Sequence, residues 1–129
     1  MRSVARTIHV VVAVLFVAAL LGQVFLAGLG VFSSPASFAD HRDFGYMLTA
    51  VPILLLVTGL AGGVGRRTAI LTVVVFGQFI LQSVLVAMRT SAPAVAALHP
   101  VNGFLILLLA IVIARDAWLA RRTAGPAVA

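Results

Sequence analysis

Four apolar runs divide the chain, at about residues 8–32, 44–64, 68–88 and 100–119. Each run is close to the ~20 residues that an α-helix needs to cross about 30 Å of hydrocarbon. Most charged side chains fall outside the runs, so each run can cross a bilayer at little electrostatic cost. The pattern predicts an all-α protein, an integral membrane four-helix bundle in which residues 1–129 form a single membrane domain.

Composition supports this prediction, because 63% of the residues are hydrophobic, only 9% are charged and the mean hydropathy is +1.21. These values lie far outside the range of soluble globular domains, so the expected surrounding is a lipid bilayer. The chain has no cysteine, which excludes thiolate catalysis and disulfide exchange by this chain alone. No basic soluble domain accompanies the net charge of +6, so we expect no nucleic-acid partner.

Most arginines collect on one side of the predicted bundle. Seven of the nine precede the first run, separate the second from the third, or flank the end of the fourth: Arg2, Arg6, Arg66, Arg67, Arg115, Arg121 and Arg122. The positive-inside bias makes this side cytoplasmic. We therefore expect a multi-pass protein of the cell (inner or plasma) membrane, with both termini in the cytoplasm.

The two halves of the chain share motifs in the same order, which indicates an internal repeat. Three pairs match at offsets of 55, 58 and 55 residues, namely Gly22-Gln23 with Gly77-Gln78, His41-x-x-x-Gly45 with His99-x-x-x-Gly103, and Arg66-Arg67 with Arg121-Arg122. Both halves cross the membrane twice in the same sense. The pattern therefore predicts two parallel two-helix repeats, related by a pseudo-two-fold axis along the membrane normal, with the two histidines facing each other.

Paired histidines of this kind suit a haem. A planar macrocycle buried between helices can take one imidazole from each face, so His41 and His99 are candidate iron ligands. Residues four apart share a helix face, so a side chain at position 45 or 103 would obstruct the ring, and Gly45 and Gly103 remove that obstruction. One extracytoplasmic haem with two axial histidines is the predicted cofactor site.

Other polar residues have candidate roles around this site. Arg42 and Arg89 are the basic residues on the outer side, where they can pair with haem propionates. Gln23, Gln78 and Gln82 lie in apolar segments and must find partners there, either by orienting a histidine or by bridging helices. His9 has no partner histidine on the inner side, so we expect it to pack at the membrane interface.

Other interpretations of the histidines stay open. A histidine near a membrane surface can simply be hydrated or cap a helix, and glycine is a common packing residue in membrane helices. Zinc is less suited to the pair, since zinc sites usually take three or four protein ligands. Asp40 in the outer loop is better placed to cap the second helix than to bind a metal.

The chain resembles one four-helix half of the haem A synthase family. The stretch that starts at Gln23 is similar to the Gln-x-x-Leu-Gly-Gly stretch of that family, His41-Arg42-Asp43-Phe44-Gly45 to its His-Arg-x-x-Gly motif, and Leu98-His99 to its fourth-helix histidine. The resemblance implies a b-type cytochrome fold with His41 and His99 as haem ligands. The family carries a glutamate three residues before the helix-two histidine, where this chain has Phe38, which argues against haem A synthesis.

The chain also resembles a small four-span membrane family of unassigned function that has similar Gln-Val-Phe-Leu-Ala-Gly and Leu-His-Pro-x-Asn-Gly motifs. We therefore expect a membrane cytochrome with one haem b, an electron-transfer protein rather than an enzyme, whose redox partner is a quinone or an extracytoplasmic protein. Two alternatives remain, a haem carrier or sensor, and a structural subunit without haem. A homo-oligomer or a larger membrane complex is compatible with each.

Overall fold

The computed structural model describes residues 1–123, and all regular secondary structure in that range is helical. Four spans are long and apolar enough to cross a membrane, namely Arg2–Phe32, Pro35–Gly62, Arg66–Ala87 and Pro93–Thr123. The protein is thus an all-α bundle with the build of a multi-pass membrane protein, as its hydropathy predicts. The helices run beyond the apolar stretches because polar residues at their ends also adopt helical geometry.

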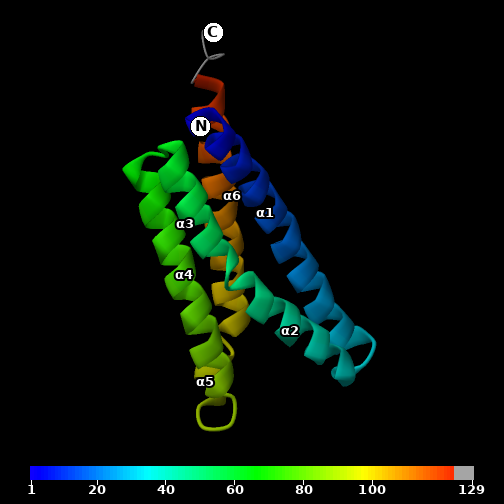
Figure 1. Cartoon of the computed structure of the whole chain (residues 1–129). Helices are drawn as coiled ribbons and strands as arrows, with labels where there is room; N and C mark the ends of the chain where they lie inside the picture. Colours follow the sequence, from blue (N-terminus) through cyan, green and yellow to red (C-terminus); the bar gives the residue numbers. More distant parts are fainter. Residues whose placement is uncertain (124–129) are drawn as a thin grey trace.

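The four spans contain seven helical elements (Figure 1), which are α1 (Arg2–Phe32), the 3₁₀ turn η1 (Pro35–Ser37), α2 (Phe38–Leu48), α3 (Val51–Gly62), α4 (Arg66–Ala87), α5 (Pro93–Ala96) and α6 (His99–Thr123). The predicted helix over 44–64 is therefore two helices. Pro52 lies in the first turn of α3, where it has no N–H to donate to the carbonyl of Leu48, and its ring disfavours a continuous helix. The resulting bend lets α2 diverge from the axis of α3.

The second span begins earlier than predicted, and its start is not capped by Asp40. Ser37 occupies the cap position of α2 without a side-chain hydrogen bond, while Asp40 lies inside the first turn. A carboxylate there is favoured by the helix dipole rather than by a capping bond. The proposed capping role of Asp40 is therefore wrong.

Both termini of the described chain lie at one end of the bundle, together with the turn between α3 and α4 (Figure 1). Gly63 makes that turn in the left-handed region, with φ of 69°, which other residues rarely adopt. Arg6 Nε donates to the Gly62 carbonyl at 2.7 Å, and Arg67 pairs with Asp116 of α6. These contacts tie α1, α3, α4 and α6 together at this end.

The bundle divides into two halves with different packing. We call residues 2–20, 51–79 and 106–123 the arginine half, and residues 21–48 and 80–105 the histidine half. Of the described residues that are buried, only Gly30, Leu48, Leu85 and Asn102 belong to the histidine half. The apolar core therefore lies in the arginine half.

Helix contacts explain this difference. In the arginine half α3 packs against both α1 and α4, and α6 packs against the same two helices, which closes a four-helix core. In the histidine half α2 packs against α1 and, within the described residues, makes no comparable contact with α4 or α6. Figure 1 shows α1 and α2 diverging from α4 toward the end remote from the termini.

Candidate functional site

The fold brings His41 and His99 together although 58 positions separate them in the chain. His41 lies in the first turns of α2 and His99 is the first residue of α6, and both are half-buried. Their ring centres are 6.2 Å apart and the ring planes are inclined at 74°. The two candidate ligands thus face one small volume of the histidine half.

Each ring is held by a backbone carbonyl of the preceding membrane span. His41 Nδ1 lies 3.0 Å from the carbonyl oxygen of Gln23, and His99 Nδ1 lies 3.4 Å from that of Gln82. A carbonyl can only accept, so each Nδ1 carries the proton and donates it. In a neutral imidazole the lone pair then resides on Nε2, which is the form that binds a metal.

The ring separation is suited to a metal held between the two rings. Imidazole nitrogen binds first-row metals at about 2 Å, and the nitrogen lies about 1 Å from its ring centre when ring bonds are near 1.3 Å. Two imidazoles on opposite sides of one metal atom thus have centres about 6 Å apart. Edge-to-face aromatic pairs in direct contact also fall in this range, so distance alone allows either arrangement.

Gln23 connects α1 to the start of α2. Its Nε2 donates to the His41 carbonyl at 2.6 Å, while its backbone carbonyl accepts from Nδ1 of the His41 ring. Gln23 therefore contacts both the backbone and the side chain of His41. A Cβ on Gly45 would lie 2.7 Å from Gln23 Nε2. Within the described chain, the glycine four residues after His41 therefore makes room for this amide.

The second half repeats the arrangement with Gln82 rather than Gln78. The Gln82 carbonyl faces the His99 ring, and its Nε2 would lie 3.4 Å from a Cβ on Gly103. Asn102, which is 4% exposed, donates from Nδ2 to Gln82 Oε1 at 2.9 Å and to the Gln78 carbonyl at 3.0 Å. Gln78 contributes its backbone here, so the glutamine that matches Gln23 is Gln82.

Sequence reasoning missed the part played by Asn102, and it matched Gln23 with Gln78 rather than with Gln82. It aligned the halves on the dipeptides Gly22-Gln23 and Gly77-Gln78. Counting back from each histidine instead gives 18 residues to Gln23 and 17 to Gln82. That count was available in the sequence, and it would have selected Gln82.

Two buried acceptors near the histidines have no hydrogen-bond partner, Gln23 Oε1 and Asn102 Oδ1. The amide nitrogen of Gln23 bonds to the His41 carbonyl, and that of Asn102 bonds to Gln82 Oε1. Buried polar atoms usually find partners, so two unpaired acceptors beside the histidines call for an explanation. They add two polar atoms, one from each half, to the surroundings of the histidine pair.

Phe38 occupies the position three residues before His41. Its ring meets the His41 ring edge-on, with centres 6.4 Å apart and planes at 85°. A Cβ on Gly30 would lie 2.7 Å from the Phe38 ring, so this glycine lets the ring pack closely against α1. The histidine therefore has an apolar neighbour on this side, rather than a carboxylate.

The structure places the two outer arginines at exposed positions. Arg42 Nε bonds to Asp43 Oδ1 at 2.7 Å, and both side chains are more than half exposed. Arg89 lies just after α4, with its guanidinium 3.5 Å from the Val86 carbonyl. Both flank the histidine half, and Arg42 already has an anionic partner.

His9 lies in the other half of the bundle and is 1% exposed. Its Nδ1 is 3.2 Å from Thr58 Oγ1, and a Cβ on Gly59 would meet the ring at 3.0 Å. Nε2 of His9 has no partner. His9 therefore packs between α1 and α3 inside the bundle, which corrects the expected interfacial position.

No group of three or more histidine, cysteine or acidic side chains that can hold a metal ion is found in residues 1–123. His41 and His99 therefore form a pair without a third such side chain beside them in the described chain. Two protein ligands suit a metal that brings its other ligands with it, as haem iron does.

One protein family matches the chain, over residues 23–90, which is just over half of its length. Its description is "Family of unknown function (DUF6220)". The matched segment includes Gln23, His41, Gly45 and Gln82 but ends before His99. No curated protein and no solved structure matches.

Proposed function

We propose that this chain, which belongs to the DUF6220 family of unknown function, binds one haem b between His41 and His99 and transfers single electrons within a membrane. The observation that carries the proposal is the geometry of the pair. The rings are 6.2 Å apart, and each donates Nδ1–H to a backbone carbonyl. Both are therefore in the tautomer that offers Nε2 to a metal.

The chemistry of the surrounding residues fits this cofactor. Haem iron with both axial positions filled by imidazole supplies one-electron redox chemistry rather than substrate activation. The Gln23 and Gln82 carbonyls fix the orientation of the rings, and Asn102 holds the Gln82 side chain in place. This positioning resembles the hydrogen bonds that commonly fix ligating histidines in metalloproteins.

The weak packing of α2 supports the same proposal. Since α2 packs against α1 and makes no comparable contact with α4 or α6 within the described residues, a molecule bound between the histidines would displace few helix contacts. The core of the arginine half, by contrast, is filled by close-packed side chains.

The matched contacts of Gln23 with His41 and of Gln82 with His99 favour the parallel-repeat hypothesis, in which each repeat supplies one ligand. The arginine half carries seven arginines and one aspartate, and the histidine half two of each. By the positive-inside bias the arginine half faces the cytoplasm of a cell membrane. The haem then lies toward the extracytoplasmic face, within reach of a quinone or an outer redox protein.

Visible spectroscopy of the purified full chain, expressed with ample haem, tests the proposal. The wild type should show a low-spin Soret band and sharp reduced α and β bands. His41→Ala and His99→Ala should each abolish this spectrum. Imidazole added to the His99→Ala protein should restore a six-coordinate signal. No such rescue is expected if His99 has a purely structural role.

His9→Ala is the matched control, since it removes a more deeply buried histidine from the other half. Its spectrum should equal that of the wild type, with helix content checked by circular dichroism for all three variants. Wild-type protein that stays colourless after haem supply would refute haem binding. A spectrum that survives both His41→Ala and His99→Ala would refute this ligand assignment.

Haem transfer is a second candidate, favoured by the half-buried histidines and by the absence of close packing between α2 and α6. The two functions differ in the rate of haem release. Transfer of haem to apomyoglobin within minutes would select a carrier, while retention over many hours would select fixed electron transfer.

A further inference from the structure

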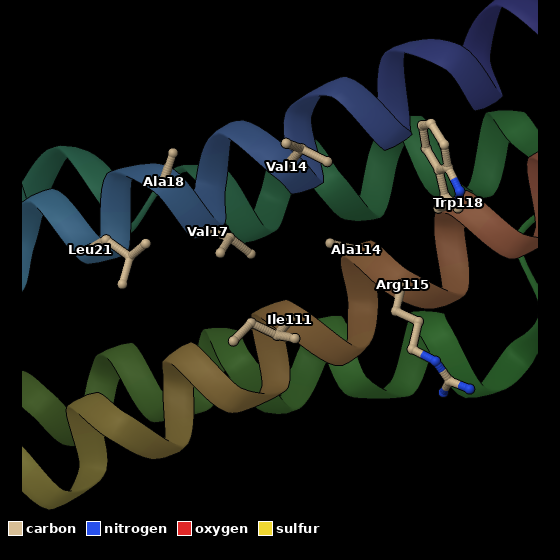
Figure 2. A pocket seen from close by; sticks show the side chains of 8 residues that line it. All are labelled: Val14, Val17, Ala18, Leu21, Ile111, Ala114, Arg115 and Trp118. Carbon is tan, nitrogen blue, oxygen red and sulfur yellow. The ribbon is translucent and has the colours of Figure 1, made fainter.

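A second binding feature lies in the arginine half, away from the histidines. A groove of about 490 Å³ lies between α1 and α6, and Figure 2 shows the side chains that line it. Val14, Val17, Ala18 and Leu21 line it from α1, and Ile111, Ala114, Arg115 and Trp118 from α6. Its volume is typical of a ligand site, and its wall is apolar except at the end formed by Arg115 and Trp118.

A smaller hollow of about 270 Å³ shares Trp118 with the groove and is otherwise lined by Arg121 and Arg122. The guanidinium of Arg122 lies over the Trp118 ring, 5.0 Å from its centre. The two hollows thus meet at Trp118, one apolar and the other cationic. An occupant of both needs an apolar tail and an anionic head.

Arg121 and Arg122 make no ion pair within the described residues, whereas Arg115 pairs weakly with Asp116. Asp116 is the acid of the arginine half, and it already pairs with Arg67, while Arg115 is 3.9 Å away from it. The side chain of Arg115 is 69% exposed. Positive charge therefore remains available for an anion at the mouth of the groove.

We infer that the α1–α6 groove binds an anionic phospholipid, with one acyl chain along the apolar wall and the phosphate at Arg121 and Arg122. A second copy of the chain fits less well, because copies with parallel orientation would bring two arginine-rich ends together. A neutral quinone would leave the arginines without a counter-charge. This inference does not depend on haem binding.

The test uses the full chain in phosphatidylcholine vesicles that contain a trace of acyl-chain spin-labelled phospholipid. Electron paramagnetic resonance measures the fraction of label that is motionally restricted by the protein. Labelled phosphatidylglycerol should be preferred over labelled phosphatidylcholine, and replacing Arg121 and Arg122 by Gln together should lower the preference about ten-fold. Ala18→Phe, which fills the apolar part, should reduce the restricted fraction of both lipids.

Matched controls separate a site from general attraction. Replacing Arg2 and Arg66 by Gln together removes the same charge from the same half, and Ala61→Phe adds the same bulk at an exposed position of α3, all outside the two hollows. Neither control should change the preference by more than about two-fold. Equal affinity for the two lipids in the wild type, or an equal loss in the variant that lacks Arg2 and Arg66, would overturn the inference. Disulfide cross-linking of an Ala18→Cys protein to a second copy in place of lipid would do so as well.

Discussion

The two halves of the bundle are built from similar apolar helices but are completed differently. In the arginine half Leu55, Val75 and Ile113 are fully buried, and even His9 is enclosed. In the histidine half α2 has Leu48 as its one buried residue within the described chain, and His41 and His99 are only half-buried. The core of the arginine half is closely packed by its own side chains, whereas the histidine half has few buried side chains.

This contrast separates residues that hold the fold from residues that can bind. Lipid is as apolar as leucine, so helices in a membrane associate through close packing and hydrogen bonds. The arginine half combines a closely packed core with polar contacts such as Arg6 to Gly62, whereas the histidine half relies mainly on hydrogen bonds such as Gln23 to His41 and Asn102 to Gln82. A half held by a few polar contacts can open at lower free energy, which binding sites require.

The largest expected effect concerns haem and the dynamics of α2. If haem completes the histidine half, supplying it at 100 times its Kd should stabilise the bound state by about 2.7 kcal/mol and slow local opening about 100-fold. Hydrogen exchange followed by mass spectrometry in detergent should show this protection in Phe38–Leu48. Exchange in Val51–Gly62 of the arginine half should change little.

The His99→Ala protein provides the control, because it should show no haem-dependent protection of α2. Equal slowing in α2 and α3 would mean that haem stabilises the whole bundle, and the contrast between halves would then be lost.

The arrangement of the spans could be read from the sequence because long apolar runs have few alternatives in a bilayer. The break between α2 and α3 could not. The apolar run continues through Pro52, and proline occurs in unbroken membrane helices where neighbours satisfy the freed carbonyl. Whether it kinks or ends a helix depends on tertiary packing, here on the divergence of α2 from α4.

A smaller effect is expected from truncating the closed core. Leu55→Ala, at 0% exposure, should lower the free energy of unfolding by about 2 kcal/mol through lost packing contacts alone. Leu54→Ala on the lipid-facing side and Leu26→Ala in the histidine half should each cost under about 1 kcal/mol. Equilibrium unfolding in mixed micelles with increasing sodium dodecyl sulfate measures all three. A loss at Leu26 as large as that at Leu55 would show that the halves are equally packed.

The proximity of His41 and His99 was predictable because the same spacing recurs in both halves. The contacts of the residues around the two histidines were less predictable. Arg42 was expected to pair with propionate but has Asp43 beside it, a choice set by local side-chain geometry. Gln78 was matched with Gln23 because the repeat was aligned on the Gly-Gln dipeptide. The carbonyl that contacts the His99 ring is that of Gln82, because this contact depends on the lengths of the helices and of the loop between them.

The smallest expected effect distinguishes the two repeats from each other. Gly45→Ala places a Cβ 2.7 Å from Gln23 Nε2 and must displace the amide from the His41 carbonyl, which should cost about 1 kcal/mol. Gly103→Ala meets Gln82 Nε2 at 3.4 Å, a contact that a small shift relieves. Gly28→Ala meets nothing within 4 Å and should be neutral or slightly stabilising, since alanine favours the helix.

Unfolding in mixed micelles ranks the three glycine variants, and the spectrum of the haem-loaded protein adds the functional comparison. If glycine serves the glutamine, only Gly45→Ala should lose stability without haem. If glycine serves the porphyrin, both Gly45→Ala and Gly103→Ala should weaken haem binding equally, whatever their stability. A role in packing predicts different losses of stability for Gly45→Ala and Gly103→Ala. A role at the site predicts equal losses of haem binding for the two variants, so the two measurements distinguish these roles.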